Sequence, residues 1–178
     1  MSWLVYIAIG LVAVAAFLYW GFVRIKERTA DAIAALRTVD EDEIPRLVQE
    51  CIRTCQEKLG IHLNLAELQE SAENLDFLLE PKQRLRTKNA FERSDHPGHF
   101  VMPLGAFMGE LVRTHRSGAR WVQRKGGGLA MDIPQGDITL TMHPFDKVLK
   151  HGATGKSGEI LAYLSEALGN PSSEGSST

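Results

Sequence analysis

The sequence predicts an α+β fold in which a single N-terminal transmembrane helix precedes a helix-rich domain with a small antiparallel sheet. Three observations lead to this class. Residues 2–23 carry no charged side chain. Apolar residues recur with helical spacing over 44–59. Residues 138–142 alternate apolar side chains with threonines, as a half-buried strand does. Because three short strands are not stable alone in water, the helices must pack on them.

The uncharged N-terminal segment, residues 2–23, is long enough to cross a bilayer. A helix of this length extends roughly 33 Å at about 1.5 Å per residue. Aromatic side chains typical of membrane interfaces lie near its two ends, at Trp3, Tyr6, Tyr19 and Trp20. A cleaved secretory signal is the alternative, but the segment lacks a basic start and a small-residue cleavage site.

The charges that follow this segment predict its orientation. Arg24, Lys26 and Arg28 come directly after it, and positive side chains usually stay on the cytoplasmic side of a membrane. The predicted location is therefore the inner (plasma) membrane, with the N-terminus outside and the C-terminal domain in the cytoplasm.

The rest of the chain divides into a helical stalk over 24–39, an α+β domain over 40–168 and a disordered tail over 169–178. The first helix of the domain carries Cys51 and Cys55 on its apolar stripe. We therefore expect two buried thiols, with a disulfide or a metal pair as the disfavoured alternative.

Two further helices are expected before the sheet. Asn64 is expected to cap the first, and Pro81 to end it. The second runs from Pro103 to Gly118. Between them, the polar and poorly periodic residues 81–99 predict a long loop, with room for a short helical turn.

The predicted sheet follows in the second half of the domain. Three short strands are expected in the segments "ARWVQR", "LAMDI" and "ITLTM", which the turns "KGGG" and "PQGD" separate. A short helix over "PFDKVLKHG" and an amphipathic helix over 158–168 complete the domain.

The stretch "HGATGKSGE" contains the Gly-Lys-Ser with which phosphate-binding loops end. Such a loop needs an earlier glycine where this chain has Lys150. It also follows a strand, whereas the residues before this stretch are predicted to be helical. We therefore expect a helix–helix junction in which Ser157 caps the last helix, and we expect no nucleotide or other cofactor.

Glu110 is the one carboxylate that attracts a functional hypothesis. It lies in "LGAFMGEL", where Gly105 and Gly109 would let another element approach the helix closely. We expect its carboxylate to be a buried partner for Arg120 or a turn amide. A catalytic acid is the alternative.

Residues 81–125 form a basic segment in an otherwise acidic chain, with 10 Lys and Arg against 3 Asp and Glu. A solvated face offset by the acidic helices is the favoured interpretation. If the segment binds a ligand, we expect an acidic partner protein, with anionic lipid as the alternative. Nucleic acid is disfavoured, since few aromatic side chains accompany the charges. The predicted binding residues are Arg113, Arg116, Arg120, Trp121 and Arg124.

The segment "DHPGH" places His96 and His99 close together beside Asp95, which makes the two histidines candidate metal ligands. A surface turn is the favoured interpretation, because proline and glycine prevent a rigid helical geometry and no third ligand is evident. The sequence contains no Ser-His-Asp pattern, no HExxH and no dinucleotide fingerprint.

Four short motifs resemble a family of uncharacterised bacterial proteins. They are "LNLAELQESAENLDFLLE", "LGAFMGELV", "GARWV" and "HPFDKVLKHG". "GARW" departs from the family's more usual Gly-Gly before the tryptophan. The resemblance covers roughly residues 61–165 and implies an α+β fold and a bacterial source, without an activity. The matching positions are Ser71, Leu75, Asp76, Gly105, Gly109, Glu110, Trp121, Pro144, Lys147 and Gly152.

Taken together, these features predict a membrane-anchored bacterial protein that acts as a non-catalytic binding or adaptor module at the cytoplasmic face of the inner membrane. Its partner would be another protein held there. The alternative is a hydrolase-like enzyme that uses Glu110 with a nearby basic residue. The enzyme requires Glu110 in a concave pocket beside a second titratable group, whereas a buried carboxylate satisfied by backbone amides favours the module.

Overall fold

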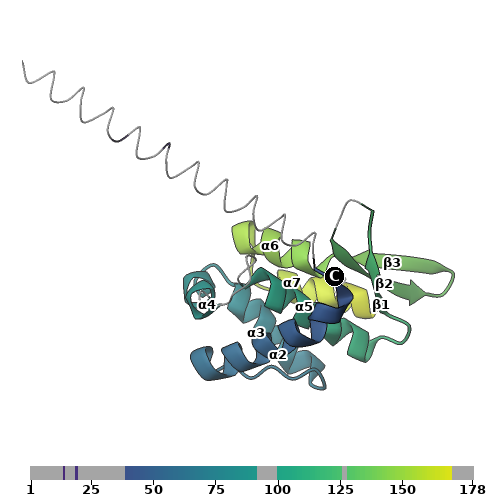
Figure 1. Cartoon of the computed structure of the whole chain (residues 1–178), viewed down its shortest axis with the longest axis horizontal. Helices are drawn as coiled ribbons and strands as arrows, with labels where there is room; N and C mark the ends of the chain where they lie inside the picture. Colours follow the sequence, from purple (N-terminus) through teal and green to yellow (C-terminus); the bar gives the residue numbers. More distant parts are fainter. Residues whose placement is uncertain (1–13, 15–18, 20–38, 92–99, 126–127, 170–178) are drawn as a thin grey trace, which may run out of the picture.

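The computed structural model describes residues 14, 19, 39–91, 100–125 and 128–169. Within these residues the chain forms six α-helices and one three-stranded antiparallel sheet. Figure 1 shows the helices packed together, with the strands at one end of them. The α+β character of the domain is therefore as predicted.

No helix in the described part of the chain is long and apolar enough to cross a membrane. The longest described α-helix, α5 (Val101–His115), has 15 residues and ends in a basic last turn, whereas a span needs about 20 consecutive apolar residues. This finding contradicts the predicted transmembrane helix. It also contradicts the single-pass inner-membrane location, which depended on that helix.

Most of the N-terminal prediction falls on residues that the structure does not describe. Of residues 2–23, only Val14 and Tyr19 are described, and residues 24–38 of the predicted stalk lie outside the described part, as does the tail from 170. The description of the domain begins at Val39, which is buried. A short 3-10 turn, η1 (Glu41–Glu43), follows it.

The first α-helix of the domain forms where its apolar stripe predicts. α2 (Ile44–Thr54) continues into a π-helical turn, η2 (Cys55–Leu59). The chain leaves this turn at Gly60 with φ +70°, a left-handed conformation that suits glycine. Cys51 and Cys55 are buried and free. Burial, together with the neighbouring Cys55, raises the pKa of Cys51 well above its usual value, so this thiol behaves as a core group, as expected.

α3 (Leu68–Leu79) also lies where the periodicity predicts, and it ends before Pro81. The predicted cap of this helix is wrong. The Asn64 side chain accepts a hydrogen bond from the N–H of Ala66, in the turn before the helix. The hydroxyl of Ser71 donates to the Asn64 carbonyl at 2.7 Å and ties this turn to the first half of α3.

The predicted loop after α3 is wrong in its first half, where α4 (Arg84–Phe91) is a helix of 8 residues rather than a short turn. This helix has no continuous apolar stripe, so periodicity does not reveal it. Tertiary contacts stabilise it instead. The hydroxyl of Thr87 donates to the Leu78 carbonyl at 2.8 Å, and Phe91 is buried. Residues 92–99 lie outside the described part of the chain.

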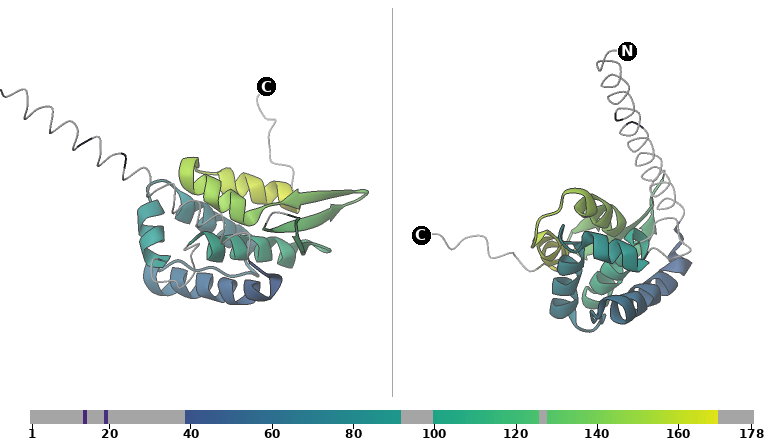
Figure 2. Two further views of the ribbon diagram at one scale, coloured as in Figure 1. Left: turned by 45° about the horizontal axis from the view of Figure 1, so that its top comes forward. Right: turned by 90° about the vertical axis from the view of Figure 1, so that its left-hand side faces the viewer.

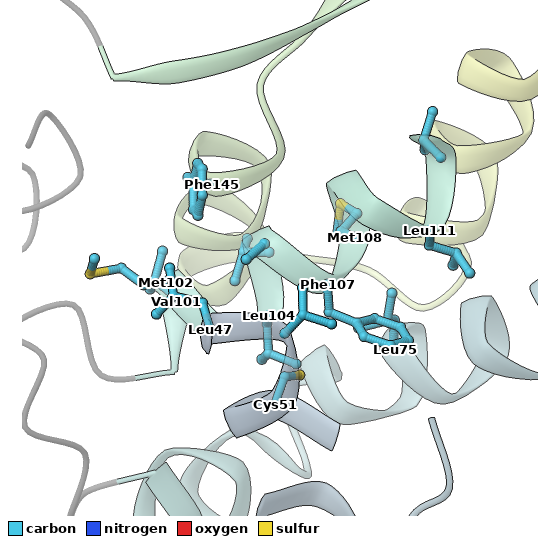
Figure 3. Packing of buried hydrophobic residues seen from close by; sticks show 14 of the residues in the cluster. Leu47, Cys51, Leu75, Val101, Met102, Leu104, Phe107, Met108, Leu111 and Phe145 are labelled. Atoms are coloured by element: carbon cyan, nitrogen blue, oxygen red, sulfur yellow. The ribbon is translucent and has the colours of Figure 1, made fainter. Parts of the chain in front are cut away.

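α5 is the centre of the fold. All of its residues ahead of the last turn are buried, because α2, α3, α6 (Pro144–Thr154) and α7 (Glu159–Leu168) all contact it. Figure 3 shows apolar side chains of α2, α3 and α6 around Leu104 and Phe107 of α5. The exclusion of this apolar surface from water is the main stabilising term of such a core.

The sheet has the strand order β1-β2-β3, and both pairs are antiparallel. The strands are β1 (Arg120–Gln123), β2 (Leu129–Gln135) and β3 (Ile138–Met142). All three lie on the predicted segments, but β2 also includes Pro134 and Gln135, which were predicted to belong to the turn. The register aligns Trp121, Met131 and Met142 in one row, and all three are buried. Figure 2 shows the β2–β3 hairpin projecting beyond the helices.

Candidate functional site

Two glycines of α5 let other side chains approach its backbone closely, as the sequence predicts. A Cβ at Gly105 would lie 2.5 Å from the ring of Phe145, and one at Gly109 would lie 2.2 Å from the ring of Trp121. Normal carbon–carbon contacts are about 3.5–4.0 Å. The two rings therefore rest directly on the helix, and their centroids lie 5.7 Å apart. This contact joins α5 to both α6 and β1.

The Glu110 carboxylate lies beside this contact, and both of its oxygens accept hydrogen bonds. Oε1 accepts from Trp121 Nε1 at 2.7 Å and from Arg113 Nε at 2.8 Å, and Oε2 accepts from Arg113 Nη2 at 2.6 Å. Its partners are thus two side chains rather than Arg120 or a turn amide. The pairing with Arg113 is a helical i,i+3 pair, a signal that was present in the sequence and that the prediction missed.

This cluster has the geometry of a structural ion pair. The Glu110 side chain is 10% exposed, whereas Arg113 lies on its solvent side and is 53% exposed. The hydrogen bond and the charge of Glu110 raise the pKa of Arg113 above its ordinary value. A two-point, charge-assisted pair fixes the orientation of a carboxylate, and the indole of Trp121 fixes it further. In this geometry Glu110 joins the second half of α5 to β1.

Two arginines of the predicted binding set contact the domain itself. Arg116 Nη1 donates to the Leu168 carbonyl at 3.2 Å and so contacts the last residue of α7. Arg124 Nη2 donates to Asp132 and, at 2.9 Å, to Thr141, and the Thr141 hydroxyl donates to the same Asp132 oxygen. The second network crosses the sheet from the end of β1 to β3. It lies on the face of the sheet opposite the buried row and joins the three strands there.

The other two residues of the predicted binding set, Arg120 and Trp121, differ in their exposure to solvent. Arg120 is exposed, but Trp121 is only 5% exposed, so its ring has no free face for a ligand. Two other arginines of the basic segment, Arg84 and Arg86, belong to α4, which lies at the opposite end of the molecule from the sheet (Figures 1 and 2). The basic segment therefore does not form one continuous face. A binding role for the five residues stays a prediction.

The Gly-Lys-Ser stretch joins α6 to α7, and a residue of α3 caps the start of α7. Asp76 Oδ2 accepts from the N–H of Gly158 at 2.6 Å, and Oδ1 accepts from the N–H of Ile160 at 3.0 Å. The predicted cap, Ser157, donates instead to Glu80 Oε1 at 2.9 Å. Sequence reasoning missed Asp76 as the cap because 82 residues separate it from Gly158, and no local pattern connects them.

Asp76 occupies the position at which a phosphate would bind the start of α7. The N–H groups that a helix N-terminus would offer to a phosphate already donate to the Asp76 carboxylate. The glycines of the loop have a separate explanation. A Cβ at Gly155 would lie 2.2 Å from the ring of His151, and Gly158 has φ +85°, which favours glycine. The stretch is thus a helix–helix junction. The predicted lack of a nucleotide or other cofactor remains untested.

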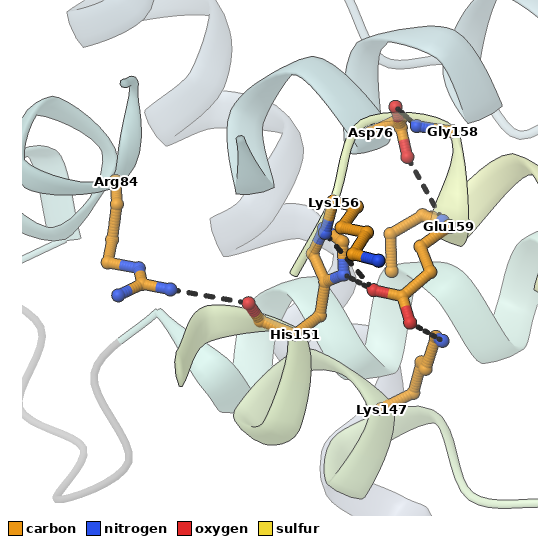
Figure 4. A network of polar contacts seen from close by, with 8 residues as sticks. Asp76, Arg84, Lys147, His151, Lys156, Gly158 and Glu159 are labelled. Atoms are coloured by element: carbon orange, nitrogen blue, oxygen red, sulfur yellow. Dashed lines mark hydrogen bonds and ion pairs between the residues drawn. The ribbon is translucent and has the colours of Figure 1, made fainter. Parts of the chain in front are cut away.

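His151 is buried at this junction beside Glu159 (Figure 4). Its Nδ1 lies 2.8 Å from Glu159 Oε2, and its side chain is 0% exposed. Lys147 Nζ lies 3.8 Å from the other carboxylate oxygen. The pKa of Glu159 is lowered, first by the backbone N–H of Lys156 and then by His151 and Lys147. Histidine–carboxylate pairs occur in catalytic sites, but this imidazole has no exposed atom. Its Nε2 has no hydrogen-bond partner among the described residues.

The structure does not describe the two candidate metal ligands. His96 and His99 both lie outside the described residues. Within the described ranges, no group of three or more His, Cys, Asp and Glu side chains could hold a metal ion.

Tyr163 of α7 is a further perturbed group near the junction. Its hydroxyl accepts a hydrogen bond from the N–H of His143 at 2.9 Å, and Lys147 Nζ lies 5.2 Å from the centre of its ring. Burial raises its pKa to about 12 from the ordinary value of 10.0.

We expect the fold to lose stability as the pH rises from about 10 towards 12. The folded state favours the neutral phenol, so this contribution is fully present below the unfolded-state pKa and is lost as the pH rises through the folded-state value. Unfolding free energies measured across this window should fall less steeply for Tyr163→Phe, and absorbance at 295 nm should show the delayed ionisation. An unchanged slope in the variant would contradict the assignment.

The outer edge of the sheet is another candidate site. Ile138, the first residue of β3, is 67% exposed, and it follows the hairpin loop formed by Gly136 and Asp137. Within the described ranges, no strand pairs with the outer edge of β3. β3 contains no charged residue, whereas the other edge strand, β1, begins with Arg120 and is followed by Arg124.

Comparisons of this chain with protein-family models, with curated proteins and with solved structures find no match. The resemblance to uncharacterised bacterial proteins is therefore neither confirmed nor refuted.

Proposed function

We propose that this domain is a non-catalytic protein-binding module that pairs an extended segment of its partner with the outer edge of β3. Binding by strand addition needs an edge whose backbone N–H and C=O groups point away from the sheet. The orientation of the β3 backbone is the observation that carries the proposal.

That orientation follows from the pairing of β2 with β3. Pro134 of β2 lies opposite Thr139 of β3. Proline has no N–H, so this is not a pair that exchanges two backbone hydrogen bonds. Bonded and non-bonded pairs alternate along an antiparallel ladder. Ile138, Leu140 and Met142 therefore direct their backbone groups to β2, whereas Thr139 and Thr141 direct theirs outward.

The composition of β3 supports the same conclusion. Natural edge strands are usually protected from other chains by charged side chains, proline or a bulge. β3 has none of these between Ile138 and Met142. Its first residue leaves an apolar side chain in water, and the hairpin projects beyond the helices (Figure 2).

The environment of Glu110 is less favourable to the alternative hydrolase. A general acid or base must reach the proton that it transfers. Both Glu110 oxygens already accept hydrogen bonds from Arg113 and Trp121, and the indole is buried. Using the carboxylate for catalysis would break the link between α5 and β1.

The proposal is tested by site-specific photocrosslinking in cells that produce the full chain. A benzophenone amino acid at Ile138 should give discrete adducts with protein, whereas the same group at Asn89, which is exposed on α4, should not. Thr139→Pro in the Ile138-labelled chain should reduce the adducts, because it removes an outward N–H without removing one that β2 uses. Adducts that form equally from both positions, or that ignore Thr139→Pro, would show the proposal to be wrong.

A further inference from the structure

We infer that the partner of the β3 edge is a second copy of this chain, in an antiparallel β3–β3 pair centred on Leu140. The inference rests on the proposed function, since it names the partner for the same edge. It follows from three properties of the strand: the spacing of its outward backbone groups, its side-chain sequence and the polar residues at its two ends.

The outward backbone groups of one β3 strand are spaced so that they can pair with the same groups of a second, antiparallel β3 strand. Thr139 and Thr141 are the two residues of β3 whose N–H and C=O groups point outward, and they lie on either side of Leu140. A two-fold axis at Leu140 places each Thr139 opposite Thr141 of the second copy. Each such pair exchanges two N–H···O=C bonds. Moving the axis by one residue in either direction leaves a threonine opposite a residue outside β3, so the central register satisfies the most groups.

The side chains are compatible with this register. Threonine would face threonine, a favourable cross-strand pair. The two Leu140 side chains would meet at the axis, and the exposed Ile138 would lie opposite Met142 of the second copy. Both of these are non-hydrogen-bonded pairs, in which side chains come closer together. The pairing therefore brings the most exposed apolar side chain of the sheet against the edge of the second copy.

The polar residues at the two ends of β3 favour a second copy over an unrelated segment. In the same register, Asp137 of one copy lies beside His143 of the other, and the symmetry repeats this contact at the opposite end. Both residues are exposed. Between residues 137 and 143 no like charges face each other, and the Asp137 carboxylate can accept a hydrogen bond from the His143 imidazole of the second copy.

The association itself is measured by sedimentation of the purified full chain. We expect the unmodified chain to dimerise and Thr139→Lys to weaken dimerisation about tenfold or more, because a charge on an edge strand opposes pairing. Asn89→Lys adds the same charge at an exposed site on α4 and should leave the dimer unchanged. Circular dichroism of each variant checks that it folds. Equal association of all three chains would overturn the inference.

The register is measured by oxidation of single-cysteine variants. In the proposed pair, Leu140 faces Leu140 of the second copy at about 4.5 Å between Cα atoms, within the range for a disulfide. Ile138 is separated from its own counterpart by four residues along the strand, roughly 13 Å. Leu140→Cys should therefore form a disulfide-linked dimer, and Ile138→Cys should not. The native Cys51 and Cys55 are buried and should contribute little. A dimer linked equally by both variants would overturn the register.

The crosslinking and the sedimentation separate the two proposals. Adducts from Ile138 with twice the mass of the chain support both. Adducts with a different protein, combined with a monomer in sedimentation, support the binding module and overturn self-association. A chain that gives no Ile138 adducts and does not dimerise contradicts both.

Discussion

Gly109→Ala is expected to lower the free energy of unfolding by about 2–3 kcal/mol, through overpacking against a buried ring. The new Cβ would lie 2.2 Å from two carbons of the Trp121 indole, and this ring is also held by its hydrogen bond to Glu110. In an exposed helix the same change would stabilise by about 1 kcal/mol, because alanine is the better helix former. A loss of stability on Gly109→Ala, rather than a gain, would therefore indicate that Trp121 packs directly against Gly109.

The measurement is chemical unfolding of four chains that form a double-mutant cycle. Trp121→Ala alone should be destabilising, because it removes a buried ring and leaves Glu110 with fewer donors. Adding Gly109→Ala to Trp121→Ala should cost much less than it costs in the native chain, since the ring that the Cβ would strike is gone. Additive losses in the cycle would mean that the glycine is required for another reason.

Asp76→Ala is expected to lower the free energy of unfolding by a similar amount, about 2–3 kcal/mol. It removes two charge-assisted hydrogen bonds to the N–H groups of Gly158 and Ile160, at 2.6 and 3.0 Å. Asp76 is buried, so the freed N–H groups would have poor access to water. Hydrogen exchange at these two amides should become faster than in the rest of the core.

Ser157→Ala is the matched control for this prediction. The sequence assigns the cap of α7 to Ser157, whereas the structure assigns it to Asp76. Ser157 is exposed and bonds to Glu80, so its replacement should change the stability by only about 0.5 kcal/mol or less. If Ser157→Ala lowered the free energy of unfolding more than Asp76→Ala, Ser157 rather than Asp76 would be the cap of α7.

The features that sequence reasoning predicted correctly are all local in the chain. The stripe of α2 and the alternation of β3 follow from the geometry of a helix and of a strand, which repeat over a few residues. The close approach to Gly105 and Gly109 was also predicted, because a missing Cβ is a property of the residue itself. The identity of the approaching rings, Phe145 and Trp121, was not predictable in this way.

The membrane prediction failed for a related reason. It was inferred from the uncharged run over residues 2–23, of which the structure describes only Val14 and Tyr19. In the described residues, by contrast, the helices are apolar where they meet one another, and none is long enough to span a bilayer. A run of apolar side chains indicates that a segment is excluded from water, but it does not name the surface that covers it.

By itself, the sequence determined where α2, α5 and the three strands form, because neighbouring residues specify a helix or a strand through their spacing. Only the tertiary structure decided that Asp76 caps α7, that Glu110 binds Arg113 and Trp121, and that α4 is a helix. Apart from the Glu110–Arg113 pair, these contacts join residues far apart in the chain or depend on burial by other elements. Such contacts form only when the folded chain brings their groups within hydrogen-bonding distance, and no repeat of neighbouring residues encodes that distance.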